Sequence, residues 1–560
     1  MGLGILEDSR LERVPGTSPL NDSGSDVEDL GLDKIQQLKH DETGKIVLIP
    51  QPSNSPNDPY NWPKWKKEMF MLTILYGCGC DGAIGPLLTS ALAPLAEEFD
   101  TPLQQFTLGL QGVLIICIGV SGLFFNPLAV KIGKRPIYLF TTLGLALTCF
   151  WGGASTTFGS LVGARAVQGL MMAPFECLIP ASIADVWFVH ERGYRTAMFN
   201  FGIVGGINLA SPLAGLIIQF AGFRVTLHAM GAAFTVMLIL VFFFMPETAF
   251  HRSGGLDIDG GVRSSPSTVE EDEIELTASE SNAESTMKAS AVLGLSTTPS
   301  NNPNRVSGEQ RMPYMKQLLP YSGYLDKAPF FGTFIRPFLM LGSPIVLWAS
   351  FLFTATISWL VLVSFVLSQI FSAPPYNFSV AAVGATNISS FVATILGTIA
   401  AGPIIDGLVK YMSKRNKGIY EPEFRLPIMI TFMVFTGIGF FAWGESLSNQ
   451  DPWPVPVIVC LGMINLGAQL GATGVTAYVV DSHRQHAAEA FAMMNFLKNL
   501  FAFGLSFYSN DWIANQGVRF AFFTIGGITM GATLTTIPMY IYGKRARSFV
   551  WRHNLLDRSK

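Results

Sequence analysis

The sequence predicts an all-α integral membrane protein with twelve transmembrane helices in two six-helix bundles. Hydrophobic residues make up 49% of the 560 residues and charged residues only 14%, which is too apolar for an ordinary soluble protein. Twelve apolar runs of about 20 residues, the length that crosses a bilayer, fall into two groups of six around a long polar segment. Lys and Arg are also distributed as this topology requires.

The predicted spans have short connections within each group. The first six cover about 69–92, 106–130, 136–154, 159–184, 196–219 and 225–245. The second six cover about 343–371, 379–402, 427–445, 454–480, 488–508 and 518–542. The polar N-terminus lacks the pattern of a cleaved signal peptide, so the first run should remain as an anchor.

Five segments follow from these spans. They are a disordered cytosolic tail (1–66), an N-terminal six-helix bundle (67–245), a flexible cytosolic insert (246–336), a C-terminal six-helix bundle (337–543) and a basic cytosolic tail (544–560). The centre of the insert is acidic, rich in Ser and Thr, and without the pattern of a packed core.

The positive charges give the orientation. With the N-terminus inside, Arg224 and Arg519 alone among the 37 Lys and Arg residues fall in outer connections, and Arg165 and Lys498 fall within spans. All the others lie in predicted cytosolic segments. Because cytosolic loops carry the excess of Lys and Arg, we expect both termini in the cytosol.

An internal repeat suggests two homologous halves. The chain reads 126-NPLAVKIGKRP-136 after the second span and 402-GPIIDGLVKYMSKRNKG-418 after the eighth. Both stretches have a proline as their second residue and run into basic residues. Parallel six-span repeats are one architecture of secondary transporters, with the substrate site near the midplane between the bundles.

At these residues the sequence resembles the major facilitator superfamily, and more narrowly its fungal twelve-span branch of drug:proton antiporter-like carriers. The resemblance covers about 57–543 without most of the insert. The matching motifs are Gly133-Lys134-Arg135-Pro136, Arg165 with Gln168 and Gly169, Glu191-Arg192-Gly193, Pro246-Glu247-Thr248 and 418-GIYEPEFRLP-427. The resemblance implies a carrier that works by alternating access, and not an enzyme.

Two motifs depart from the family pattern. Val130 replaces the acidic residue expected in the first basic turn, whereas Asp406 keeps it in the second copy, so a charge lock between the halves would be lopsided. The span-five antiporter motif is reduced to Pro212 and Gly215 within 207–216, which weakens the inference to antiport. The residues that we expect to act in conformational change are Gly133, Lys134, Arg135, Arg192, Pro212, Gly215 and Asp406.

Polar residues inside the spans are candidates for the transport pathway, because a charge in the membrane usually faces a bundle interior or a cavity. Asp81 and Glu176 are carboxylates that could exchange protons, with Glu176 favoured. Helical spacing puts Arg165, Gln168 and Glu176 on one stripe. The alternative for Arg165 is a structural tie to neighbouring helices.

The remaining candidates lie mainly in the second half. Lys498 shares a helix face with Asn495 and Asn499; it could face the cavity and pair with a carboxylate, or extend to the cytosolic interface. Asn465 and Gln469 form a similar pair in span ten. For Gln111 and Asn387 we expect hydrogen bonds between helices.

Other patterns predict little chemistry. Asn377 begins a glycosylation triplet close to the membrane. The six cysteines lie in apolar runs and should be free thiols. We expect no metal and no cofactor, and the absence of a phosphate-binding Gly-Lys-Ser/Thr loop argues against an ATP-driven pump.

The leading hypothesis is proton-coupled export of a small organic compound, such as a secondary metabolite or xenobiotic. The alternatives are proton-coupled or facilitated uptake of a polar or cationic nutrient, such as a polyamine, and a nutrient receptor that does not transport. The expected partners are a small-molecule substrate, protons and the bilayer, without nucleic acid. We expect a monomer in the plasma membrane, with the vacuole or another internal membrane as the alternative.

Overall fold

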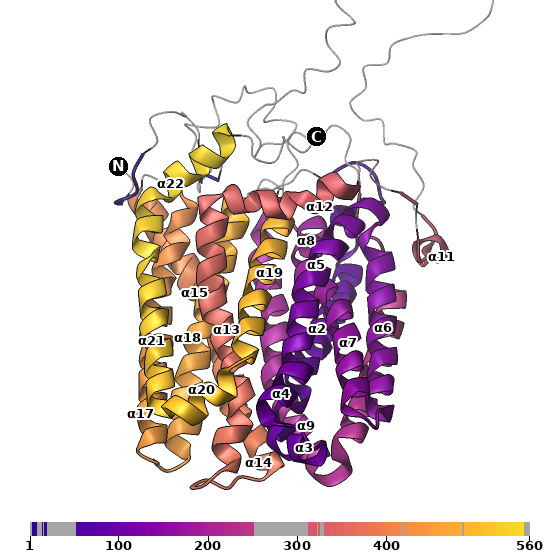
Figure 1. Cartoon of the computed structure of the whole chain (residues 1–560). Helices are drawn as coiled ribbons and strands as arrows, with labels where there is room; N and C mark the ends of the chain where they lie inside the picture. The colour runs from indigo at the N-terminus through magenta and orange to yellow at the C-terminus, as the bar shows by residue number, and fades with distance from the viewer. Residues whose placement is uncertain are drawn as a thin grey trace, which may run out of the picture.

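The computed structural model describes residues 3–7, 14, 16–19, 52–250, 312–321, 323, 324, 330–416, 419–483 and 486–553. The centre of the predicted insert and much of both predicted tails therefore lie outside the described residues. The described chain is almost entirely helical, and its long helices run side by side in two groups (Figure 1).

The N-terminal half contains the first six crossings. Its elements are η2 (Pro59–Asn61), α2 (Lys64–Ile84), η3 (Pro86–Ala91), α3 (Leu92–Glu98), α4 (Leu103–Thr107), the π-helical turn η4 (Leu108–Gly112), α5 (Val113–Ile132), α6 (Lys134–Ala154), α7 (Phe158–Cys177), α8 (Ile179–Val186) and α9 (Val189–Phe244). Within α9, Gly222 has a φ of 85° and a ψ of 164° and separates two helices. Glycine adopts this positive φ without steric cost, so the chain can reverse there.

The C-terminal half contains the other six crossings. Its elements are α11 (Tyr314–Gln317), α12 (Phe330–Leu339), η5 (Met340–Gly342), α13 (Pro344–Ser372), α14 (Val380–Ala385), α15 (Asn387–Arg415), β2 (Ile419–Tyr420), η6 (Pro422–Ile428), α16 (Met429–Phe432), the π-helical turn η7 (Met433–Gly437), α17 (Ile438–Ser448), the π-helical turn η8 (Val455–Cys460), α18 (Leu461–Ser482), α19 (Ala487–Ser506), α20 (Ser509–Gln516), α21 (Val518–Leu534) and α22 (Thr536–Arg552).

The described residues make twelve crossings. Ten helical stretches are long and apolar enough to cross a membrane. One of them, Tyr194–Phe244, contains the Gly222 break and crosses twice, and α19 with α20, bent by 48°, adds another crossing. The observed architecture agrees with the predicted fold class.

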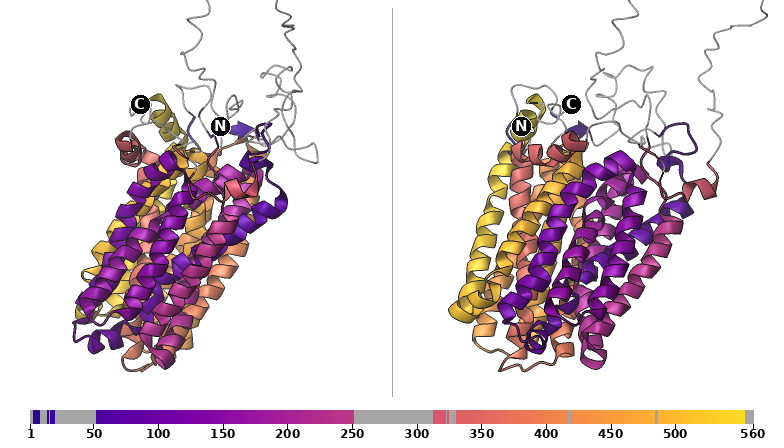
Figure 2. Two further views of the ribbon diagram at one scale, coloured as in Figure 1. Left: turned by 90° about the vertical axis from the view of Figure 1, so that its right-hand side faces the viewer. Right: turned by 45° about the vertical axis from the view of Figure 1, so that its right-hand side comes forward.

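The ends of the described chain lie at the same end of the bundle, where α12 runs across the other helices (Figure 1). The distribution of Lys and Arg predicts that this end faces the cytosol, and we call it the cytosolic end. The opposite end is called the outer end. Two further views show the long helices continuing between these ends (Figure 2).

The two halves meet mainly where α5 packs on α19 and where α9 packs on α14 and α15. Several hydrogen bonds between the halves lie at the outer end of the bundle. Gln104 donates to the Ser506 carbonyl at 2.5 Å, and Asn510 donates to Thr107 at 3.0 Å. Gln219 accepts from the Ala381 amide at 2.9 Å. These contacts hold the outer ends of the halves together.

The N-terminal tail differs from the expectation that residues 1–66 are disordered. Its β1 (Ser18–Pro19) pairs antiparallel with β2, in the connection before span nine. Ile5 is buried against the C-terminal half with 5% of its surface exposed, and Val14 is 4% exposed. Burial of apolar side chains and strand pairing explain why these residues of a polar tail have a defined place.

Two predicted segment boundaries also differ from the observed limits of the helices. Helix α12 lies largely within the segment predicted as a flexible insert, and its aromatic side chains pack on both halves, with Phe334 on Phe124 of α5 and Phe338 on Phe496 of α19. Helix α22 continues nine residues into the segment predicted as a C-terminal tail and ends at Arg552.

Candidate functional site

An ion pair joins the two halves in the interior of the bundle. Lys498 Nζ of α19 lies 3.2 Å from Glu176 Oε2 of α7, and their side chains are 11% and 16% exposed. The carbonyl of Lys498 accepts a hydrogen bond from buried Ser358 of α13. Lys498 therefore faces the interior and does not extend to the cytosolic interface. Each half contributes one charge to this pair.

Glu176 lies where its helix is interrupted. Pro174 is within α7, and Pro180 lies in the first turn of α8. Pro180 has no N–H, so it cannot donate to the carbonyl four residues earlier, that of Glu176. The interruption between α7 and α8 positions the Glu176 carboxylate beside α19.

Asp81 supplies a second carboxylate next to this pair. It lies on α2, is 1% exposed, and interacts electrostatically with both Glu176 and Lys498. Its Oδ1 accepts no hydrogen bond from a described residue. The structure thus brings together the two carboxylates and the lysine that the sequence singled out in three separate spans. Of the two carboxylates, Glu176 is the one that lies within ion-pair distance of the Lys498 ammonium group.

The other polar residues of α19 lie near the same centre. Asn495 contacts the thiol of Cys177, the residue after Glu176. Asn499 is 4% exposed, its Cβ packs towards Gly119 of α5, and its amide nitrogen donates to no described residue. Both lie on the helix face that carries Lys498, as the spacing predicts.

Arg165 ties α7 to the end of α2. It is fully buried, and its Nη1 donates to the Ile84 carbonyl at 2.8 Å and to Gln168 Oε1 at 3.3 Å. Gln168 in turn contacts the sulfur of Cys149 on α6. These contacts support the structural role for Arg165. Its Nε and Nη2 have no partner among the described residues.

Asn465 and Gln469 join α18 to α15. Asn465 donates to Ser390 Oγ at 2.9 Å, and Gln469 donates to Thr398 Oγ1 at 3.1 Å. Asn208 of α9, which the sequence analysis did not select, donates to Thr394 of α15 at 2.8 Å. Asn208 could have been selected from the sequence because it is a polar residue within a predicted span.

The two isolated amides, Gln111 and Asn387, lie in different environments. Gln111 lies in the π-helical turn η4, is 2% exposed, and its Nε2 has no partner among the described residues. Asn387 begins α15 and is half-buried, without a side-chain hydrogen bond to any described residue. Neither amide forms the expected bond between helices in the described structure. The exposed Asn377 lies before α14 at the outer end.

The basic turn of the N-terminal half binds two acidic residues at the cytosolic end. Lys134 Nζ lies 2.6 Å from Asp185 Oδ2 of α8. The carboxylate of Glu247, after α9, accepts from the amides of Lys134 and Arg135 at 3.1 Å and 3.0 Å. Gly133 has a φ of 93°, and a Cβ there would lie 2.3 Å from this carboxylate. The motif therefore holds together the cytosolic ends of spans three, four and six.

The corresponding network of the C-terminal half uses different residues from those expected. Arg425 Nε lies 2.6 Å from Asp481 Oδ2 of α18. Arg547 of α22 binds Glu421 at 2.7 Å and Glu423 at 2.8 Å. Arg425, Glu421 and Glu423 belong to the 418–427 motif and not to the repeated stretch 402–418.

Asp406 does not form the charge lock that the sequence suggested. Its residue is exposed on α15 and makes no ion pair with a described residue. An exposed carboxylate is solvated by water and does not need a charged partner, whereas Glu421 and Glu423 are buried and do.

The span-five motif lies in the contact between halves. A Cβ on Gly215 would lie 2.9 Å from the carbonyl of Val380 on α14, so a larger residue would push the halves apart there. Pro212 lies one turn earlier within α9. Arg192 lies in the cytosolic turn of α9, and its side chain is outside the described structure.

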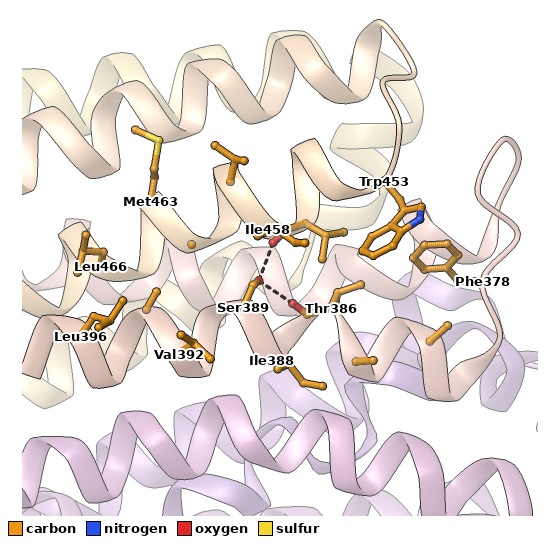
Figure 3. Close-up of a pocket in the computed structure, with 16 residues that line it drawn as sticks. Phe378, Thr386, Ile388, Ser389, Val392, Leu396, Trp453, Ile458, Met463 and Leu466 are labelled. Atoms are coloured by element: carbon orange, nitrogen blue, oxygen red, sulfur yellow. Dashed lines mark hydrogen bonds between the residues drawn. The ribbon is translucent and has the colours of Figure 1, made fainter.

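A separate groove of about 840 Å³ lies between α14 and α15 on one side and η8 and α18 on the other (Figure 3). Ile388, Leu396 and Ile458 in its lining are half-exposed on the outside of the bundle. Ser389 already donates to the Val457 carbonyl at 2.6 Å. The groove contains none of the predicted pathway residues, and its apolar lining suits the hydrocarbon of the bilayer.

The sequence profile of the Major Facilitator Superfamily matches residues 69–506. The chain belongs to this superfamily of transporters. Among its curated relatives, an uncharacterized MFS-type transporter of Schizosaccharomyces pombe is 26% identical, over 97% of this chain and 94% of its own. Protein HOL1 of Saccharomyces cerevisiae is 26% identical, over 96% of both chains.

More distant relatives agree with the superfamily assignment. Efflux pump vrtL of Penicillium aethiopicum is 22% identical over 85% of both chains. The structure of the proton:xylose symporter XylE, bound to 6-bromo-6-deoxy-D-glucose, superposes with a TM-score of 0.56 over 86% of this chain and 97% of its own, at 15% identity. At this identity the superposition shows the shared fold alone.

Proposed function

We propose that the protein is a secondary active transporter that exports a small organic compound in exchange for protons. The observation that carries the proposal is the Glu176–Lys498 ion pair, because one charge comes from each half. Alternating access moves the halves relative to each other around a midplane site. A pair that spans the halves can therefore have a different energy in the two states.

Protons would act on this pair through the carboxylates of Glu176 and of the neighbouring Asp81. A proton on Glu176 removes the attraction to Lys498, and Asp81 then remains as the neighbouring carboxylate for the ammonium group. A proton can bias the exchange between states only through such a difference in affinity. We assign Glu176 as the main proton-exchange group and Asp81 as its alternative partner for Lys498.

The direction of transport rests on a relative. The name of vrtL, an efflux pump, supports export. We propose a monomer in the plasma membrane, as the family resemblance implies, and both termini in the cytosol, as the distribution of Lys and Arg indicates.

A second candidate function is uptake of a cationic nutrient such as a polyamine. It is favoured by the excess of carboxylates, since Asp81 and Glu176 face one lysine. An organic cation could bind one carboxylate while Lys498 pairs with the other. In this alternative the carboxylates are substrate ligands.

Cellular retention of labelled compounds tests the two candidates. A fungal host with and without the protein is given a panel of lipophilic compounds and labelled polyamines, before and after collapse of the proton gradient. Export predicts lower retention of some compound, restored when the gradient is lost. Higher polyamine retention would replace export with uptake. Equal retention of the whole panel at normal membrane expression would contradict both.

A further inference from the structure

The beginning of the chain binds the cytosolic end of the C-terminal half. We call residues 3–7, 14 and 16–19 the N-terminal segment. The Leu6 amide donates to the Ile541 carbonyl of α22 at 3.0 Å, and Glu7 Oε2 lies 2.6 Å from Lys544 Nζ. The segment thus follows the last helix before it reaches β2.

Thr17 lies at the charged centre of this contact. Its Oγ1 donates to Glu421 Oε2 at 2.7 Å and accepts from Arg547 Nη1 at 3.3 Å. The next residue, Ser18, pairs with Tyr420 in the short sheet. The Thr17 hydroxyl therefore bridges a carboxylate and a guanidinium group.

Gly16 brings the segment unusually close to the half. It has a φ of 88°, and a Cβ there would lie 3.1 Å from the Asp481 carbonyl and 3.2 Å from both Arg547 Nη1 and Pro422 Cγ. A β-branched residue at this position would meet both steric contact and an unfavourable backbone conformation. Gly16 therefore offers a way to displace the segment without changing any charge.

The cations around Thr17 already contact carboxylates. Arg547 binds Glu421 and Glu423, and Lys544 Nζ lies 2.8 Å from Glu421 as well as close to Glu7. Burial alone would raise the pKa of Glu421, but the charge of Arg547 and the hydrogen bond from Lys544 hold it below its ordinary value. A new negative group at Thr17 would thus meet an ionised carboxylate at hydrogen-bonding distance.

We propose that Thr17 is a phosphorylation site and that its phosphorylation releases the N-terminal segment from the C-terminal half. A protein kinase would transfer the γ-phosphoryl group of ATP to Thr17 Oγ1. The new P–O bond replaces the bond to ADP, and the hydroxyl proton leaves to the base of the kinase. The phosphate adds about two negative charges, and placed next to a carboxylate it disrupts the contact by repulsion.

Thr17 is half-buried while the segment is bound, so the state of the segment determines whether Thr17 can be modified. A kinase needs the hydroxyl exposed, so it acts on the fraction of molecules in which the segment is released. The phosphate then opposes rebinding and increases that fraction. Phosphorylation would act as a switch between bound and released segments.

Hydrogen exchange of the full-length protein in lipid nanodiscs tests the release. The protein is isolated from a fungal host with phosphatase inhibitors, and half of it is treated with phosphatase. Phosphate should be found on Thr17, and the peptide containing Leu6 should exchange about tenfold faster before phosphatase treatment than after it. Thr17→Glu should give the faster exchange without a kinase.

Three variants separate charge from packing. Thr17→Ser keeps the hydroxyl and should retain slow exchange, and Gly16→Val should exchange fast at unchanged charge. Gln317→Glu adds a carboxylate beside Lys66, on the other half, and should leave the Leu6 peptide unchanged. Unchanged exchange in both the phosphorylated protein and Thr17→Glu would overturn release. Protein from growing and starved cells without phosphate on Thr17 would overturn the modification.

Discussion

In the N-terminal half, Lys134 pairs with Asp185 at 2.6 Å, and in the C-terminal half Arg425 pairs with Asp481 at the same distance. In both halves the base lies at the beginning of the third crossing and the acid lies near the end of the fourth. The two ion pairs are therefore equivalent positions of the internal repeat. The two ion pairs differ in the additional charged residue that lies next to each of them.

In the N-terminal half the additional partner is a carboxylate held by backbone amides. Glu247 accepts from the first amides of α6, where the helix dipole also favours a negative charge. In the C-terminal half it is the guanidinium of Arg547, 2% exposed, held by two buried carboxylates. One topology is therefore stabilised by two kinds of charged contact, and the second kind depends on complete compensation of its buried charges.

The largest effect should come from removing the buried cation. Arg547→Met would leave Glu421 and Glu423 buried with only Lys544 nearby, and loss of one partner of a buried pair costs about 3–5 kcal/mol. We expect a strongly lowered thermal midpoint and reduced expression, measured by fluorescence-detected size exclusion. Adding Glu423→Gln should recover part of the loss. A midpoint unchanged in the single variant would contradict the compensation argument.

Acid should weaken the C-terminal network more than the N-terminal one. His483 follows α18, accepts or donates to Ser343 at 3.0 Å, and burial, followed by the charges of His486 and Arg547, lowers its pKa to about 4. In the unfolded chain this histidine binds a proton near pH 6.5, whereas in the folded chain it does so only near pH 4. The free energy of unfolding therefore has its full value above pH 6.5. It falls by up to about 3 kcal/mol as the pH approaches 4.

A pH series of thermal midpoints checks this histidine. His483→Gln should flatten the decline between pH 6.5 and 4, while a matched His228→Gln, in α9 of the N-terminal half, should keep it. The same decline in both variants would assign the acid sensitivity to other groups.

A smaller effect is expected from the more exposed N-terminal pair. The side chains of Lys134 and Asp185 are 14% and 29% exposed, so water can compensate part of the loss. Asp185→Asn should cost about 1 kcal/mol. A midpoint shift as large as that of Arg547→Met would show that the two networks do not differ as described.

The smallest effect should come from Asp406, the family position kept only in the second half. Asp406 is exposed and has no ion pair with a described residue, so Asp406→Asn should change stability by less than about 0.5 kcal/mol. Transport rates measured with the same variant would show whether the residue acts in another conformational state. A large stability loss would mean that its carboxylate is bound after all.

The fold could be predicted because membrane crossings leave a strong sequence signal. A span needs about 20 apolar residues and the charges between spans alternate, so the number of crossings could be counted. The bend after α19 and the helical continuation of α22 could not, because apolar length does not reveal a kink or a helix that leaves the membrane. The docked N-terminal segment was missed because its apolar residues, Leu3, Ile5, Leu6 and Val14, do not form the periodic pattern of a helix or a strand.

The candidate site could be predicted only as a set of unusual residues. Asp81, Glu176 and Lys498 stand out because charges are rare in spans, but their proximity depends on how three helices pack. The stretch 402–418 was selected by its likeness to the first basic turn, whereas Arg425, seven residues beyond its end, forms the ion pair. Loop length between repeats is free to vary, so sequence position could not identify the partner.

The most direct test of the transport proposal is proton-driven flux in proteoliposomes for the wild type, Glu176→Gln and Asp81→Asn, with the substrate found in the retention assay. Lys498→Met serves as the control that removes the shared cation. Glu176→Gln should lose at least about tenfold of the gradient-driven rate while it keeps exchange of substrate without a gradient. Gradient-driven rates and pH dependence that remain unchanged in both carboxylate variants would contradict the assignment of proton coupling to this centre.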